Sequence, residues 1–219
     1  MGRLVDDLYN LAVDLVPKDS APHFGQLLLL SHKSFLSAIT LIGQAQPEDA
    51  AAVTRRAIEI ARVALAVKQD PQNADKWMAH EKRMGRWQAR EKGEKPRHLT
   101  VPLDLPNDHP ILKELERHLG ILSDAYIHFT PEFFGSQDWK RSQGRIDLRY
   151  FTSDPKTIRR DLVELTGVHV SALRIFDECL GGPFSKSSEW LNLWNTLKKE
   201  GGKLSEEFAP TTAEGGSHG

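Results

Sequence analysis

The chain has 219 residues, a length that fits one large domain or two small ones. Its 29 lysines and arginines nearly balance 30 aspartates and glutamates, which argues against a broadly basic nucleic-acid binder, although a local basic patch is compatible with this balance. The single cysteine, Cys179, excludes an intramolecular disulfide and a cysteine-based zinc site and favours a reducing cytoplasm. Acidic residues interrupt the apolar repeat of the N-terminus, so we expect no signal peptide.

Apolar spacing and prolines predict the first three helices. Leucines recur every three or four residues over 3–16, and Pro17 ends that helix. Ser20 is expected to cap a second helix that runs from Pro22 to about residue 45. A third helix over 47–68 opens with acidic residues, which its positive end favours. Its broad apolar face predicts a place at the centre of a helix bundle.

The second helix approaches the length of a membrane span over residues 25–45. His32 and Lys33 lie in the middle of this stretch, where a charge would cost a few kcal/mol in lipid. We therefore expect a core helix of a bundle and no membrane contact.

The middle of the chain predicts two further helices. After a break at Asp70-Pro71, a charged helix that runs to about residue 91 has only a thin apolar stripe that includes Trp77, so we expect it at the periphery. Residues 92–109 hold three prolines and predict a long loop. A helix over 110–128 follows, with a regular leucine stripe.

The last third predicts a break in the helical pattern and then two helices. Alternating apolar residues predict a small β-hairpin or strand insertion near 133–152. Helices are expected over 156–179 and 188–199. We therefore predict a mainly α class: one multi-helix bundle domain over 1–205, followed by a disordered Gly-rich tail over 206–219.

The third helix carries the most distinctive charges. Arg55, Glu59 and Arg62 share one face at spacings of four and three residues. They form either a solvated ion-pair ladder, worth less than about 1 kcal/mol, or a charged patch that lines an inter-helix cleft for an anionic ligand. Arg56 falls on an apolar flank, where we expect it to need an internal partner.

A second candidate pair closes the helix over 110–128. Asp124 lies one turn before His128, so its carboxylate can orient the imidazole and raise its pKa, as in acid–base catalysis. A histidine at the end of a helix is also favoured by the helix dipole alone, which predicts a capping or packing role.

Motifs for metals and nucleotides are missing from the sequence. It has no His-x-x-x-His, Glu-x-x-His or Gly-x-Gly-x-x-Gly pattern and no phosphate-binding loop, so we expect no metal and no cofactor. Basic residues alternate with tryptophans around 77–92, but interleaved glutamates favour a solvated face over nucleic-acid binding.

Three segments together carry a family resemblance: Arg55-Arg56-Ala57-Ile58-Glu59, the sequence Leu-Ser-Asp-Ala-Tyr-Ile-His over 122–128, and the strand-like insertion before the helix at 156–179. With these segments the chain resembles uncharacterised bacterial helical proteins that are distantly similar to HEPN-type and abortive-infection proteins. The resemblance implies an all-helical fold and a cytoplasmic bacterial setting. HEPN ribonucleases carry an arginine four to six residues before a histidine at a helix end, whereas this chain has residues 122–124 there, none of them arginine.

These observations favour a protein that binds a partner or a small anionic ligand between helices. The expected binding residues are Arg55, Arg56, Glu59, Arg62 and Ser123. The alternative is a divergent HEPN-type ribonuclease that uses His128 with an arginine from another helix, and its candidate catalytic residues are His128 and Asp124. A protein partner or a homo-oligomer is compatible with both, and nucleic acid is the weaker expectation.

Overall fold

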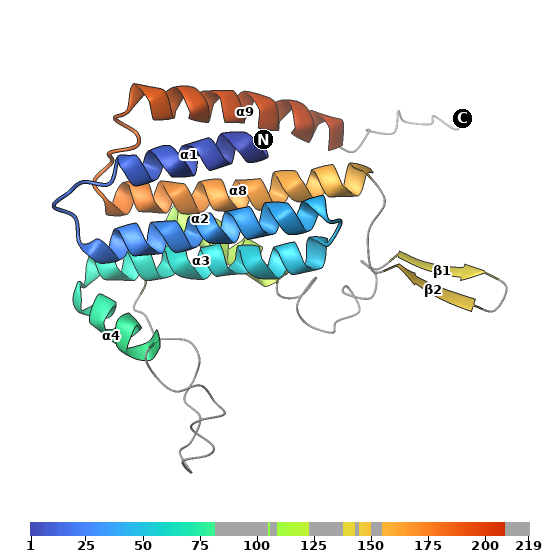
Figure 1. Cartoon of the computed structure of the whole chain (residues 1–219), viewed down its shortest axis with the longest axis horizontal. Coiled ribbons are helices and arrows are strands. Elements are labelled where there is room, and N and C mark those ends of the chain that lie inside the picture. Colours follow the sequence, from blue (N-terminus) through green and yellow to red (C-terminus); the bar gives the residue numbers. More distant parts are fainter. Residues whose placement is uncertain (82–104, 106–108, 123–137, 143–144, 150–154, 209–219) are drawn as a thin grey trace, which may run out of the picture.

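The computed structural model describes residues 1–81, 105, 109–122, 138–142, 145–149 and 155–208 (Figure 1). Seven helices lie within this part of the chain: α1 (Gly2–Asp14), α2 (Pro22–Gly43), α3 (Pro47–Gln69), α4 (Gln72–Glu81), α6 (Pro110–Leu122), α8 (Pro155–Cys179) and α9 (Ser188–Phe208). The mainly α class predicted from the sequence is confirmed. Strands β1 (Asp138–Ser142) and β2 (Arg145–Arg149) pair antiparallel, with Lys140 opposite Asp147.

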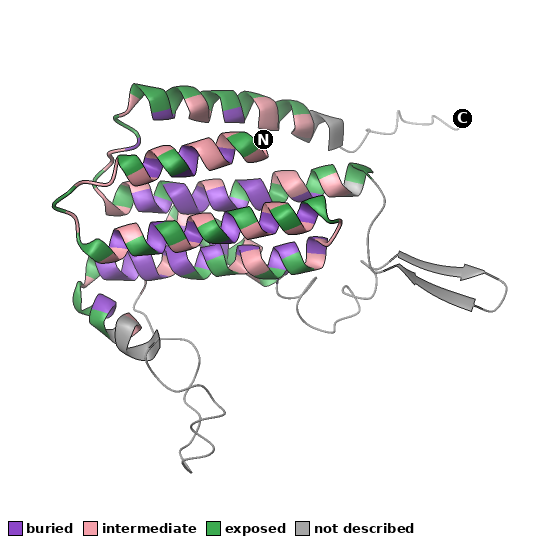
Figure 2. Ribbon diagram, viewed as in Figure 1, coloured by how far each residue is buried: buried purple, intermediate pink, exposed green. Residues whose placement is uncertain are grey.

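Helix α3 is central to the bundle, as its apolar face predicts, because it packs against α2, α4, α6 and α8. Glu48 and Asp49 lie in its first turn and Lys68 in its last turn, which is the arrangement that the helix dipole favours. The N-terminal ends of α3 and α8 point the same way in Figure 1, and α2 runs in the opposite direction. Buried residues run along both α3 and α8, whereas α9 keeps a long exposed face (Figure 2).

The buried apolar side chains form two clusters that share α2, α3 and α8. The first cluster joins α1 to α2, α8 and α9, and we call it the α1 cluster. Its members include Leu8, Tyr9, Leu27, Phe35, Phe176, Phe184 and Trp190. The cluster around α6, here the α6 cluster, includes Ala50, Ala51, Ile58, Leu112, Leu115, Leu122, Leu165 and Val168. Helices α2, α3 and α8 therefore contribute to both halves of the core.

Two predicted boundaries are wrong. Ala21 is the N-cap of α2, and the Ser20 hydroxyl instead donates a hydrogen bond to the Pro17 carbonyl at 2.6 Å. Helix α9 continues beyond residue 199 to Phe208, so the expected start of the tail at residue 206 falls inside a helix. A Cβ on Gly201 would lie 3.7 Å from Met1 Cε, so α9 packs along α1 here and tertiary contact overrides the low helix propensity of glycine.

Helix α2 is the one described helix that is long and apolar enough to cross a membrane. About half of its most apolar window, 44%, is buried inside the bundle, and the core helix of a soluble protein meets the same criterion. Its outer side exposes two leucines, Leu29 at 55% and Leu36 at 46%.

Several expectations lie outside the described residues. They concern the end of the charged helix beyond Glu81, the loop over 92–109 apart from Leu105 and His109, and the tail from residue 209. The candidate residues Ser123, Asp124 and His128 also lie outside the described part of the chain.

Candidate functional site

The predicted pair on α3 is present. Arg55 Nε donates a hydrogen bond to Glu59 Oε1 at 3.2 Å, and the two side chains are 31% and 47% exposed. An exposed pair at this spacing contributes about 0.3–0.5 kcal/mol, so it stabilises the helix only slightly. The pair therefore behaves as part of a solvated ladder, and its charges stay accessible to a ligand.

The side chain of Arg62 extends toward α6. Its Nη2 lies 3.8 Å from Glu116 Oε1, which is a long ion pair between two half-exposed side chains. Its Nε is buried and has no hydrogen-bond partner in the described part of the chain. A buried donor without an acceptor is unfavourable by about 1–3 kcal/mol, so this guanidinium has an unmet requirement for an acceptor.

The expectation for Arg56 is wrong. Its side chain is exposed and makes no ion pair or hydrogen bond with another described residue. The neighbours of α3 cover its other sides and leave a strip with Ala52, Arg56 and Glu59 open to solvent. The arginine with a buried group is Arg62, one and two-thirds turns further along the helix.

A three-residue network fixes where α6 begins. Glu178, near the end of α8, accepts hydrogen bonds from Lys68 Nζ at 2.9 Å and from His109 Nε2 at 2.8 Å. His109 also caps α6, because its Nδ1 accepts the Leu112 N–H at 3.2 Å. Nδ1 is thus the unprotonated nitrogen, and Nε2 carries the proton that Glu178 accepts.

The pKa of Glu178 reflects this network. Burial alone would raise the pKa of its carboxyl, but the hydrogen bonds from Lys68 and His109 outweigh burial and hold it below the ordinary value of 4.5.

These contacts give α6 an antiparallel register against α3. It starts beside Lys68, at the end of α3, and meets Arg62 through Glu116 about two turns later. Leu122 follows Glu116 by six residues, and Arg56 precedes Arg62 by six. The end of α6 therefore lies at about the level of Arg55 and Arg56, and the site candidates that follow Leu122 lie outside the described residues.

Sequence reasoning missed a polar network in the α1 cluster. The Tyr9 hydroxyl lies 2.8 Å from Ser31 Oγ and 3.1 Å from Nδ1 of His169, and all three residues are fully buried. Burial lowers the pKa of His169 to about 3, aided by the charge of His32, and raises the pKa of Tyr9. His169 is thus a neutral imidazole inside the core.

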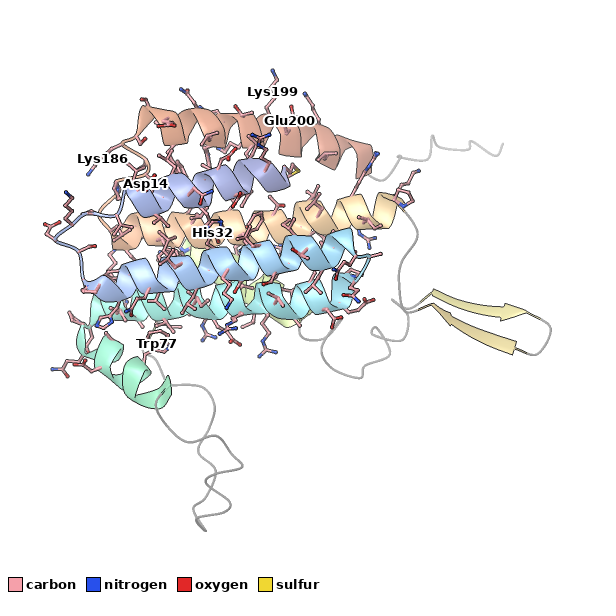
Figure 3. The ribbon with its side chains drawn as sticks, viewed as in Figure 1. Asp14, His32, Trp77, Lys186, Lys199 and Glu200 are labelled. Carbon is pink, nitrogen blue, oxygen red and sulfur yellow. The ribbon has the colours of Figure 1, made fainter. Side chains whose placement is uncertain are left out.

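His32 connects this network to the surface between α1 and α2 (Figure 3). Its ring stacks on Tyr9 with 4.9 Å between the ring centroids, and its Nε2 lies 2.7 Å from Asp6 Oδ1. The signal that could have found Tyr9 is its place on one helix face with Val5, Leu8 and Ala12.

The α6 cluster also contains two polar groups that sequence reasoning missed. Thr54 on α3 is fully buried, and its Oγ1 has no hydrogen-bond partner among the described residues. Asp161 on α8 is 5% exposed, and its Oδ1 accepts two hydrogen bonds from the adjacent Arg160, at 3.4 Å from Nε and 3.3 Å from Nη2. Burial raises the pKa of this carboxyl, and Arg160 offsets only part of the effect.

Metal binding and thiol chemistry find no support in the described part of the chain. No group of three or more His, Cys, Asp or Glu residues there could hold a metal ion. Cys179 is half-buried, and burial raises the pKa of its thiol to about 12, so it is a protonated packing residue.

The described residues define a class, a mainly α multi-helix protein in which a charged face of α3 meets α6 through Arg62 and Glu116. Comparison of the chain with family models, curated proteins and solved structures gave no match.

Proposed function

We propose that the chain is a cytoplasmic bacterial protein that binds a small anionic ligand between α3 and α6. The binding groups are Arg55 and Arg62, with Glu59 holding Arg55 in place. Arg56, on the solvent-facing strip of α3 beside them, and Ser123 are proposed as further contacts. The resemblance to bacterial helical proteins and the single cysteine support this setting.

The observation that carries the proposal is the incomplete pairing of Arg62. A guanidinium has five N–H donors in a planar fork that fits a carboxylate or phosphate. Among the described residues, the buried Nε of Arg62 has no acceptor, and the ion pair of Arg62 with Glu116 is long at 3.8 Å. Arg56 is exposed nearby, and no described residue pairs with it. An anion on this face would accept the hydrogen bond that Arg62 Nε lacks, and the positive charge of Arg56 would attract it.

The experiment is a thermal-shift titration with inorganic phosphate and with adenosine monophosphate. At a hundredfold excess over Kd, a ligand that binds only the folded chain stabilises it by about 2.7 kcal/mol. At about 2–4 °C per kcal/mol for this chain length, we expect a rise in Tm of about 5–10 °C. Arg62→Gln should weaken binding by at least about tenfold, because a hydrogen bond to a charged group contributes about 1.5–3 kcal/mol.

Arg174→Gln is the matched control. Arg174 is an exposed arginine on α8 without an ion pair or hydrogen bond to another described residue, so its loss removes the same charge elsewhere. If both substitutions weaken ligand binding equally, the arginines contribute only through the net charge of the chain. If millimolar ligand does not raise the Tm of the unaltered chain, the proposal is rejected.

The alternative function is a divergent HEPN-type ribonuclease. The register of α6 supports this alternative. Helix α6 ends with Leu122 at about the level of Arg55, and His128 comes six residues after Leu122 in the sequence. Cleavage of single-stranded RNA that disappears in both His128→Ala and Arg62→Gln, but not in Arg174→Gln, would favour this alternative over simple ligand binding.

A further inference from the structure

The outer side of α2 carries two exposed leucines next to α1. Leu29 and Leu36 are 55% and 46% exposed, and they are two of the three exposed large apolar side chains in the described part of the chain. They lie seven residues apart, so they share one face of α2 at a separation of about 10 Å. His32 lies between them at spacings of three and four residues, and it contacts Asp6 of α1. The two leucines therefore border the junction of α1 with α2.

Two contacts set the levels of α1 and α2, which lie side by side and run in opposite directions (Figure 1). His32 Nε2 lies 2.7 Å from Asp6 Oδ1, and a Cβ on Gly2 would lie 3.6 Å from Ile39 Cδ1. The residues that directly follow Asp6 and His32 therefore lie within about 3 Å of the same level along the two helices.

These two residues are Asp7 on α1 and Lys33 on α2, which carry opposite charges. Lys33 is exposed and lies four residues after Leu29 and three before Leu36, so it shares their outer face. Asp7 is half-buried. Neither Asp7 nor Lys33 makes an ion pair or a hydrogen bond with another described residue. The surface thus combines exposed leucines with one unpaired acid and one unpaired base.

We propose that this surface of α1 and α2 is the interface of a symmetric dimer, with a second copy of the chain as its occupant. A twofold axis that runs parallel to the helices, between α1 and α2, sets α2 of each copy over α1 of the other copy at the same level. Lys33 of each copy then meets Asp7 of the other, so the interface contains this ion pair twice. Leu29 and Leu36 lie beside the axis and pack against the same leucines of the second copy.

The charges favour this axis over the other symmetric arrangement. An axis perpendicular to the helices would set α2 against α2 in opposite directions, and Lys33 at the centre of the exposed face would meet its own copy. Like charges placed against each other oppose association. Helix α1 has 13 residues and is only about 20 Å long, so the contact is small and we expect a Kd in the micromolar range.

The test is sedimentation velocity of the full chain across micromolar concentrations, with the two charges exchanged. The unaltered chain should show a reversible equilibrium between monomer and dimer, which high salt weakens. Lys33→Glu and Asp7→Lys should each weaken the dimer by at least about tenfold, because each substitution sets like charges against each other twice. The double variant restores opposite charges in exchanged positions and should dimerise about as tightly as the unaltered chain.

Two controls locate the interface. Lys113→Glu makes the same change of charge on an exposed residue of α6, and Leu191→Asp alters the third exposed leucine, on α9. Both variants should keep the dimer, whereas Leu29→Asp should abolish it. Circular dichroism and Tm should match the unaltered chain in all variants, because none of the altered side chains is buried.

A chain that stays monomeric at all these concentrations would overturn the inference, and so would a double variant that associates no better than the single variants. Binding of such a monomer to phosphatidylglycerol vesicles, lost in Leu29→Asp, would instead assign the leucines to a membrane surface. The inference is independent of the proposed anion site, because α1 packs against α2, α8 and α9 and that site lies between α3 and α6.

Discussion

Lys68 Nζ lies 2.9 Å from Glu178 Oε1 and so joins the last turn of α3 to the last turn of α8. His109 donates to the other carboxylate oxygen of Glu178, which brings the start of α6 to the same point. This single carboxylate sets the relative levels of the three helices around the proposed site.

Glu178→Gln should destabilise the fold modestly at neutral pH. The carboxylate is 42% exposed, so we expect a loss of about 0.5–1 kcal/mol. The low pKa of the carboxyl stabilises the folded chain above pH 4.5, and this contribution is lost as the pH falls below that value. Urea denaturation should therefore separate the two chains at pH 7 and bring them together near pH 3. Glu164→Gln, on an exposed residue of the same helix, should change neither value.

Tyr9→Phe should destabilise the fold much more than a surface change would. The substitution leaves Ser31 Oγ and His169 Nδ1 without their shared partner in the core, at a cost of about 1–3 kcal/mol. Adding Ser31→Ala should cost less than its effect alone, because the hydroxyl is already unpaired in Tyr9→Phe. Strictly additive values in denaturant unfolding would show that the two hydroxyls do not interact.

His169→Leu should flatten the acid dependence of stability. The unfolded chain binds a proton on this histidine below pH 6.5, whereas burial keeps the folded residue neutral down to about pH 3. The folded state therefore loses stability as the pH falls through this range, by up to about 1.4 kcal/mol per pH unit. Unfolding free energies at pH 7, 6 and 5 measure the slope. Parallel slopes in the two chains would contradict a buried neutral His169.

Asp161→Asn should raise Tm at pH 7. Burial raises the pKa of this carboxyl above 3.8, so the folded state favours the protonated form and loses stability as the pH rises through the shifted pKa. An amide removes that unfavourable charge, and the gain should vanish at pH 3. Differential scanning calorimetry at both pH values provides the comparison. A lower Tm at pH 7 would mean that the carboxylate stabilises the fold.

The sequence predicted the helices well, because the bounds of a helix depend on the spacing of apolar residues and on prolines that end or begin it. The leucine repeat ended by Pro17 and the restart at Pro22 place α1 and α2 within a few residues of their observed bounds. The Arg55–Glu59 pair followed from the same geometry, since both residues belong to one helix.

Contacts between helices could not be predicted in this way. Helical periodicity gives the direction of Arg56 around α3, but it does not show that this direction lies outside the bundle. Tyr9 and His169 meet across 160 positions, and no local pattern links them. Asp161 is a charged residue on an otherwise apolar face of α8. Sequence alone predicts that such a residue is exposed, and its burial follows only from the packing of α3 and α6 against α8.

The most direct test of the central claim is an NMR titration that follows the Nε–H groups of the arginines. If the anionic group of a ligand accepts a hydrogen bond from Arg62, the Nε–H resonance of Arg62 should shift and become protected from solvent exchange as inorganic phosphate is added. The resonance of Arg174 should stay in place. An Nε–H resonance of Arg62 that does not move, or equal shifts of the Arg62 and Arg174 resonances, would contradict an anion site between α3 and α6.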